Sequence, residues 1–119
     1  KRRREIAKMY DDELKGVRNI IAQKIYPHIK SSYYAYIVRS TKGNLNKHRN
    51  ELSVNGIETS PMFTTIYNMK AYRNLFGNCN NFCPISEKLD KQTFTIPLHP
   101  KLTNKEVEFV ITNIKKTFN

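Results

Sequence analysis

The sequence is poor in several features that define classes of protein. Its 119 residues contain no tryptophan, two cysteines and four glycines. Acidic residues are also scarce, with 10 Asp and Glu against 21 Lys and Arg. Apolar residues never run on for the about 20 positions that a membrane helix needs. The composition therefore excludes membrane-spanning, collagenous and disulfide-stapled proteins.

The size and the apolar content indicate one folded domain that covers residues 1–119. A mass of 14.0 kDa fits a single domain, and 39% of the residues are hydrophobic, with seven tyrosines and six phenylalanines. This composition is unlike that of a disordered tail. The chain opens with a basic run, Lys1 to Arg4, and has no initiator methionine. We therefore expect it to be part of a longer protein.

The net charge of +11 raises the question of an anionic partner. Clustered cations beside stacking aromatics can hold single-stranded nucleic acid, and Tyr33, Tyr34 and Tyr36 lie close to Arg39 in the sequence. The other cations are spread along the chain, however, and no RNA-recognition, GXXG or zinc-finger motif occurs. A solvated basic surface is favoured, and a binding module for nucleic acid or an anionic polymer stays open as an alternative function.

The two cysteines do not indicate a metal centre. Cys79 and Cys83 are separated by three residues, and the histidines lie at no standard metal-ligand spacing from them. The spacing also differs from the redox Cys-x-x-Cys motif. We expect no metal and two ordinary thiols in a reducing compartment.

The two ends of the chain have the clearest helical patterns. Near the start, apolar side chains recur every four residues at Ile6, Tyr10 and Leu14. Near the end, Thr103 and Glu106 match a capping box. The residues after this box place one apolar stripe on a helix, formed by Val107, Val110, Ile111 and Ile114. A long helix is predicted at each end.

Shorter helices are predicted between them, one of them near residues 68–75. Asn44 is a suitable N-cap for a helix that ends before Gly56. Pro84 suits the first position of another helix, where its missing N–H has no partner to lose. In that helix Ile85 and Leu89 lie four residues apart, and we expect both to point inward.

Two strands complete the predicted fold. Residues 31–39 are rich in aromatic and β-branched side chains on both alternate faces, which predicts a central strand covered on each side. Residues 93–98 alternate polar and apolar and are closed by Pro97 and Pro100, which predicts an edge strand. The fold class is therefore α+β, with a small, mostly antiparallel sheet packed against helices and long helices at both ends.

The chain lacks the common motifs of a self-sufficient enzyme. Its glycines are far apart, so no Gly-rich phosphate loop can form, and no Gly-x-Ser-x-Gly elbow or zinc-protease motif occurs. Carboxylates cluster only at residues 11–13, on the expected exposed face of the first helix. No catalytic residue is predicted.

Several segments, in order, resemble the C-terminal part of the DegT–DnrJ–StrS family of sugar aminotransferases. The resemblance covers essentially the whole chain, and its Gly-Ile-Glu-Thr-x-Pro-x-Phe form is most similar to the branch that makes 4-amino-4,6-dideoxy sugars. The matching segments are the basic start at 1–10, the aromatic strand at 32–39, the helix and Gly-Ile exit at 45–57, the Gly-Ile-Glu-Thr-x-Pro-x-Phe stretch at 56–63, the Cys-Pro helix at 83–89 and the closing segment at 96–107.

The resemblance implies that this chain is one domain of a larger protein and that another domain binds the cofactor. In this family a larger N-terminal domain holds pyridoxal 5'-phosphate (PLP) and its Schiff-base lysine, and glutamate donates an amino group to a 4-keto-6-deoxy nucleotide sugar. The resemblance also implies a cytoplasmic homodimer. Nothing in this chain matches the family's cofactor motifs, so no cofactor-binding residue and no bound PLP are expected here. A purely structural or dimerisation domain is the third alternative.

The resemblance places a substrate-binding wall at Ser60, Pro61, Phe63 and Tyr67. Pro61 and Phe63 match the family pattern. Ser60 stands where the branch often has arginine, which would pair with a phosphate, and Tyr67 stands where histidine is usual. These two departures imply that other residues hold the diphosphate, that the substrate preference differs, or that activity is lost.

Overall fold

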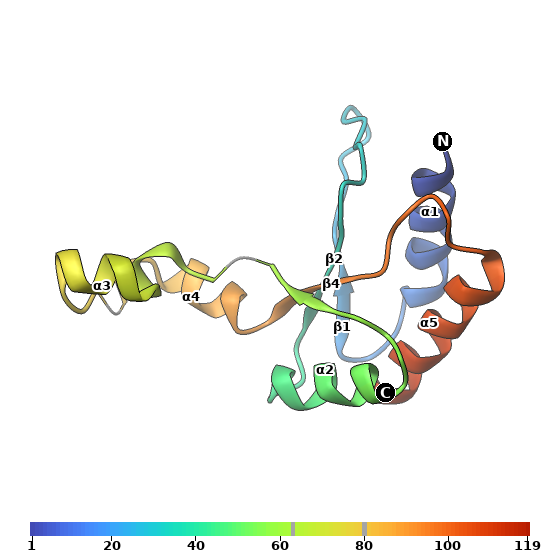
Figure 1. The fold of residues 1–119 in the computed structure, drawn as a ribbon. Helices are drawn as coiled ribbons and strands as arrows, with labels where there is room; N and C mark the ends of the chain where they lie inside the picture. Colours follow the sequence, from blue (N-terminus) through green and yellow to red (C-terminus); the bar gives the residue numbers. More distant parts are fainter. Residues whose placement is uncertain (63, 80) are drawn as a thin grey trace.

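The computed structural model describes residues 1–62, 64–79 and 81–119. It contains four short strands and, among the described residues, helices at both ends and in the middle (Figure 1). The helices are α1 (Arg2–Leu14), α2 (Leu45–Val54), the 3-10 turn η1 (Ile66–Asn68), α3 (Lys70–Phe76), α4 (Pro84–Asp90) and α5 (Asn104–Phe118). The strands are β1 (Ile20–Ala22), β2 (Tyr36–Ser40), β3 (Ser60–Pro61) and β4 (Thr93–Ile96).

The strands form one antiparallel sheet in the order β1-β2-β4-β3. This arrangement confirms the predicted α+β class. The prediction of an edge strand at 93–98 is wrong, because the two residues of β3 pair with Thr95 and Phe94 on the outer side of β4. Pro61 tolerates the outermost position because an edge residue needs no second ladder hydrogen bond.

Strand β2 is central, as predicted, but it is shorter and less covered than predicted. It begins at Tyr36, because Tyr33 adopts a left-handed backbone with φ of 49°. Its side chains alternate between buried and half-buried, so only one face lies in the core. The run of apolar residues therefore continues into an exposed connection, where Tyr34 is 77% exposed.

Helices α1 and α5 lie side by side against the sheet, and α2 packs on α5 (Figure 1). The predicted apolar faces of both end helices are buried, and the capping box of Thr103 and Glu106 is formed. We call α1, α2, α5 and the sheet, with their connections, the body. The largest fully buried side chains all lie in the body: Tyr10, Tyr36, Phe94, Phe118, Ile6, Leu14, Leu52, Ile114, Val38, Val107 and Ser40.

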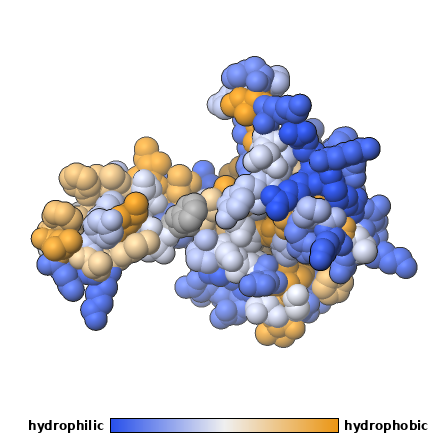
Figure 2. Space-filling view, turned by 45° about the horizontal axis from the view of Figure 1, so that its top comes forward, coloured by the Kyte–Doolittle hydropathy of each residue, from blue (hydrophilic) through white to orange (hydrophobic). Residues whose placement is uncertain are grey.

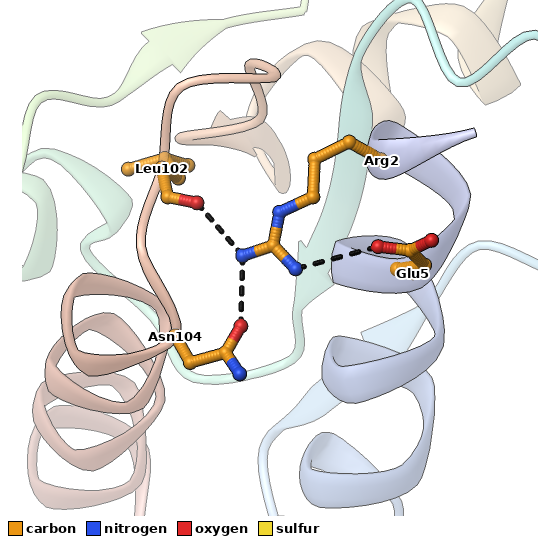
Figure 3. A network of polar contacts seen from close by, with 4 residues as sticks. All are labelled: Arg2, Glu5, Leu102 and Asn104. Carbon is orange, nitrogen blue, oxygen red and sulfur yellow. Dashed lines mark hydrogen bonds and ion pairs between the residues drawn. The ribbon is translucent and has the colours of Figure 1, made fainter.

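A polar network joins the first turns of α1 and α5 (Figure 3). The Arg2 guanidinium donates through Nη2 to the Leu102 carbonyl and to Asn104 Oδ1, both at 2.8 Å. Its Nη1 lies 3.5 Å from a Glu5 carboxylate oxygen. One planar fork thus satisfies acceptors on two elements that are about 100 residues apart in sequence.

The segment from η1 to α4, residues 66–90, extends away from the sheet, and we call it the arm (Figure 1). It contains no buried residue in η1, α3 or α4. Helix α4 begins at Pro84 as predicted, but Ile85 and Leu89 do not point inward, since they are 75% and 37% exposed. No helix in the described ranges is long and apolar enough to span a membrane.

Candidate functional site

A cavity of about 680 Å³ lies beside β3 and the end of β4. Its volume is within the range of small-molecule sites, about 300–1,000 Å³. The strand residues, the connection from Pro97 to Leu102 and the first turns of α5 form its walls. The lining residues are Tyr34, Ala35, Gly56, Ile57, Glu58, Ser60, Pro61, Met62, Thr95, Ile96, Pro97, Leu98, His99, Leu102, Glu106, Phe109 and Val110.

This cavity offers a phosphate neither lysine nor arginine among its described lining residues. Its ionisable side chains include the carboxylates of Glu58 and Glu106 and the imidazole of His99. The Thr103 backbone N–H and hydroxyl donate to Glu106 Oε2 at 2.7 and 2.8 Å, and these hydrogen bonds lower the pKa of Glu106. The carboxylate is therefore held in its charged form, which repels an anion.

Ser60 and Pro61 are the two predicted site residues that line this cavity. Both are exposed, because they form the outer strand β3. Their backbone is held by pairing with Thr95 and Phe94 of β4. The structure therefore places these two residues on the outer strand of the sheet, where they line the cavity. Phe63 lies outside the described residues.

Tyr67 lies on the arm and does not line the cavity. Its hydroxyl donates to Glu87 Oε1 at 2.6 Å and accepts from the Cys83 backbone N–H at 3.1 Å. Partial burial and the hydrogen bond to Glu87 raise the pKa of Tyr67 to about 12. The Asn81 N–H also donates to Glu87, at 2.7 Å. The hydrogen bonds of Tyr67 and Glu87 thus connect η1, the loop before α4 and α4 itself.

A second cavity, of about 500 Å³, contains cations that the sequence did not single out. Arg49, Lys91 and the carboxylate of Asp90 line it together with Pro61, which also lines the first cavity. The Asp90 carboxylate accepts hydrogen bonds from Thr65. Arg49 donates through Nε and Nη2 to the side chain and carbonyl of Thr59, at 3.1 and 2.8 Å. Arg49 and Lys91 are far apart in the sequence, and the fold brings both to one cavity. No local motif could therefore have identified them.

The aromatic cluster that motivated a nucleic-acid site is not formed. Tyr36 is fully buried and its hydroxyl donates to Asp11 Oδ1 at 2.5 Å. Arg39 donates to Gln92 Oε1 at 2.9 Å across the sheet. Tyr34 is exposed, whereas Tyr33 packs partly against the core. The rings therefore do not present one stacking surface beside a cation, and that interpretation of these residues is wrong.

The cysteines and possible metal ligands are dispersed. Cys79 and Cys83 are free thiols, each half-buried. Within residues 1–62, 64–79 and 81–119, no group of three or more His, Cys, Asp or Glu side chains is placed to hold a metal ion. The candidate site is therefore built from the two cavities that Pro61 lines.

Comparisons with known proteins agree over the whole chain. The DegT/DnrJ/EryC1/StrS aminotransferase family model matches residues 1–115. The chain is 31% identical to the dTDP-4-dehydro-2,3,6-trideoxy-D-glucose 4-aminotransferase of Saccharopolyspora spinosa, over 97% of this chain and 29% of that protein. It is also 31% identical to the uncharacterised protein MJ1066 of Methanocaldococcus jannaschii, over 98% of this chain and 31% of that protein.

Among solved structures, the fold is similar to that of Spr1654 from Streptococcus pneumoniae. The apo form matches with a TM-score of 0.90 and 28% identity, over 98% of this chain and 30% of that chain. A PLP form of the same protein matches with a TM-score of 0.89. The chain thus spans about a third of the length of the relatives that it matches.

Proposed function

The chain belongs to the DegT/DnrJ/EryC1/StrS aminotransferase family, and we propose that it is the C-terminal small domain, residues 1–119, of a PLP-dependent sugar aminotransferase. The complete protein transfers an amino group from glutamate to a 4-keto-6-deoxy nucleotide sugar, and it works as a cytoplasmic homodimer. This chain contributes one wall of the substrate site. A larger N-terminal domain holds the cofactor.

The observation that carries this proposal is that the matches cover nearly all of this chain but less than a third of each relative. Nearly all of this chain aligns with its relatives, yet it spans only 29–31% of their length. One of these relatives is named as a 4-aminotransferase of a dTDP-linked 4-keto sugar. A domain with this match is best explained as one part of a protein whose other part performs the chemistry.

The larger cavity of this chain does not fit PLP by itself. The cofactor needs a lysine for its aldehyde and donors for its phosphate. The larger cavity has neither lysine nor arginine among its described lining residues, and its two carboxylates disfavour a phosphate. We therefore derive no chemical step from this chain and assign the cofactor to the larger domain.

The wall that this chain supplies runs along β3. In this proposal Ser60, Pro61, Phe63 and Tyr67 bind the substrate, and the lining of the larger cavity by Ser60 and Pro61 supports the first two. Arg49 and Lys91, in the cavity on the other side of Pro61, are the cations that could replace the missing arginine at position 60. Charge-assisted hydrogen bonds from such cations to a diphosphate are worth about 1.5–3 kcal/mol.

The division of labour is tested by adding PLP to this chain and to the complete protein. We expect the 119-residue chain to bind no PLP and to show no visible absorbance of protein-bound cofactor. The complete protein should bind it and convert a 4-keto nucleotide sugar with glutamate. Binding of one PLP per 119-residue chain would overturn the proposal.

The diphosphate site is tested in the complete protein with Lys91→Ala. We expect KM for the nucleotide sugar to rise about tenfold with little change in kcat, because the interaction acts equally on bound substrate and transition state. Val54→Ala, at an exposed position on α2, is the matched control. An unchanged KM would remove Lys91 from the site.

A further inference from the structure

The arm has an unusual surface for a segment of a folded protein. Its helices place large apolar side chains in solvent, and Figure 2 shows them spread over most of the arm. The body also exposes large apolar residues on β1 and its connection to β2, and singly on its helices, but all of its helices have a buried face. These exposed residues of the body are Ile21, Ile25, Tyr26, Ile29, Tyr34, Val54 and Phe109. The exposed apolar residues of the arm are Ile66, Met69, Tyr72, Leu75, Phe76, Phe82, Ile85 and Leu89.

The total surface of the molecule is larger than its mass predicts. A compact monomer of 14.0 kDa has an accessible surface of about 6,700 Å². This chain has 8334 Å², an excess of about 1,600 Å². Its radius of gyration, 15.7 Å, also exceeds the about 13.5 Å expected for 119 residues. A standard protein interface buries about 800 Å² per partner, so the excess is large enough for a stable interface.

The arm is ordered internally without a core of its own. Besides the contacts of Tyr67 with Glu87, the Thr65 N–H and hydroxyl donate to Asp90 Oδ2, each at 3.1 Å. On α3 the rings of Tyr72 and Phe76 stack with centroids 6.4 Å apart, which forms a continuous apolar stripe. Helices α3 and α4 each have seven residues, and isolated helices of that length are marginal in water.

We propose that the apolar face of the arm is the docking surface for the larger, cofactor-holding part of the aminotransferase polypeptide. This inference rests on the proposed function. The relatives have about 70% of their length outside the segment matched here, so a large partner surface exists in each of them. Covering the arm would bury the stripe on α3 and stabilise both short helices.

Charge favours this occupant over a second copy of the arm. Residues 66–82 of the arm contain Lys70 and Arg73 and no carboxylate. The two carboxylates of the arm, Glu87 and Asp90, already accept hydrogen bonds from neighbouring residues of this chain. A twofold symmetric contact through α3 would bring cations of both copies onto one surface, with no carboxylate on α3 to pair with them. The partner surface is therefore expected to be apolar at its centre, with Asp or Glu at its rim.

The test is hydrogen exchange measured by mass spectrometry on the complete protein and on the 119-residue chain. In the chain alone, peptides from the arm should exchange almost freely while those from α5 stay protected. In the complete protein the arm peptides should exchange at least about tenfold more slowly. Equal exchange of the arm in both proteins would overturn the inference.

A pair of variants identifies the surface. In the complete protein, Leu75→Glu combined with Phe76→Glu should abolish the arm protection and leave that of α5 unchanged. Val54→Glu, which adds a charge at an equally exposed apolar site on the body, should leave the arm protected. If Val54→Glu also removes the protection, or if the double variant retains it, the arm face is not the docking surface.

Two further measurements separate the possible failures. If the 119-residue chain sediments as a dimer that Leu75→Glu dissociates, a second copy covers the arm and the inference is wrong. PLP binding by the complete protein is an independent readout of the proposed function. A complete protein that protects the arm but binds no PLP would contradict the proposed function and leave the docking surface supported.

Discussion

The body and the arm contain similar apolar side chains, but they place them in opposite environments. Phe94 and Phe118 are fully buried in the body, with stacked rings 5.7 Å apart. Phe76 and Phe82 of the arm are 69% and 77% exposed. The difference is not one of composition or of helix pattern, because both regions have apolar residues at helical spacing. It shows that an apolar stripe is buried only where a second layer lies opposite.

The largest expected contrast is between phenylalanines of the two regions. Phe118→Ala should lower the free energy of unfolding by about 3–5 kcal/mol, because it removes a ring packed on Phe94 and leaves a cavity. Phe76→Ala should change it by less than about 0.5 kcal/mol, since its ring is already in water. Urea unfolding of both variants measures the difference. Similar losses would mean that the arm belongs to the same cooperative unit as the body.

A smaller loss is expected when the link between the end helices is removed. Arg2→Ala should cost about 1 kcal/mol, because it deletes charge-assisted hydrogen bonds to Leu102 and Asn104 at a partly exposed site. Arg2→Lys keeps the charge but not the planar fork, so it should recover only part of the loss. Thermal unfolding of the three proteins tests this, and full recovery with lysine would show that only the charge matters.

Acid should weaken the body through a histidine on α2. His48 is buried against Phe118, and desolvation, followed by the charge of Lys42, lowers its pKa below the ordinary 6.5. The unfolded chain then binds the proton more readily, so stability is greatest above pH 6.5 and falls as the pH drops through that value. His48→Gln should flatten this pH dependence of urea unfolding between pH 7.5 and 5.

The smallest effect on global stability is expected in the arm. Tyr67→Phe deletes hydrogen bonds to Glu87 and from Cys83, yet unfolding of the body should change by less than about 0.5 kcal/mol. Hydrogen exchange of residues 66–90 should accelerate at the same time. A global destabilisation comparable to that of Phe118→Ala would contradict the separation into body and arm.

Local signals predicted much of the body. Ile6, Tyr10 and Leu14 share a helix face because the helical repeat is 3.6 residues, and the structure buries all three. The capping box at Thr103 and the N-cap at Asn44 also depend on residues within one turn, and both are formed. Such features could be predicted because the contacts that produce them are close in sequence.

The errors concern neighbours that are far apart in sequence. Ile85 and Leu89 show a four-residue spacing, but spacing alone does not state whether a layer lies beneath them. The strand at 93–96 reads as an edge because Pro97 ends it, whereas β3 arrives from more than 30 residues away to cover its side. In the candidate site, motif resemblance found Ser60 and Pro61, but no local pattern indicated Arg49 and Lys91.

The sequence by itself determined the helices with their caps, the mostly antiparallel α+β class and the family, because these follow from short-range backbone and side-chain preferences and from ordered motifs. Only the tertiary structure decided which apolar stripes are buried, how β3 completes the sheet, and that the described residues lining the larger cavity include carboxylates and no lysine or arginine. Those outcomes depend on which distant segments come into contact. The free energy gained by burying an apolar surface depends on both of the segments that cover each other, so neither segment's sequence alone determines it.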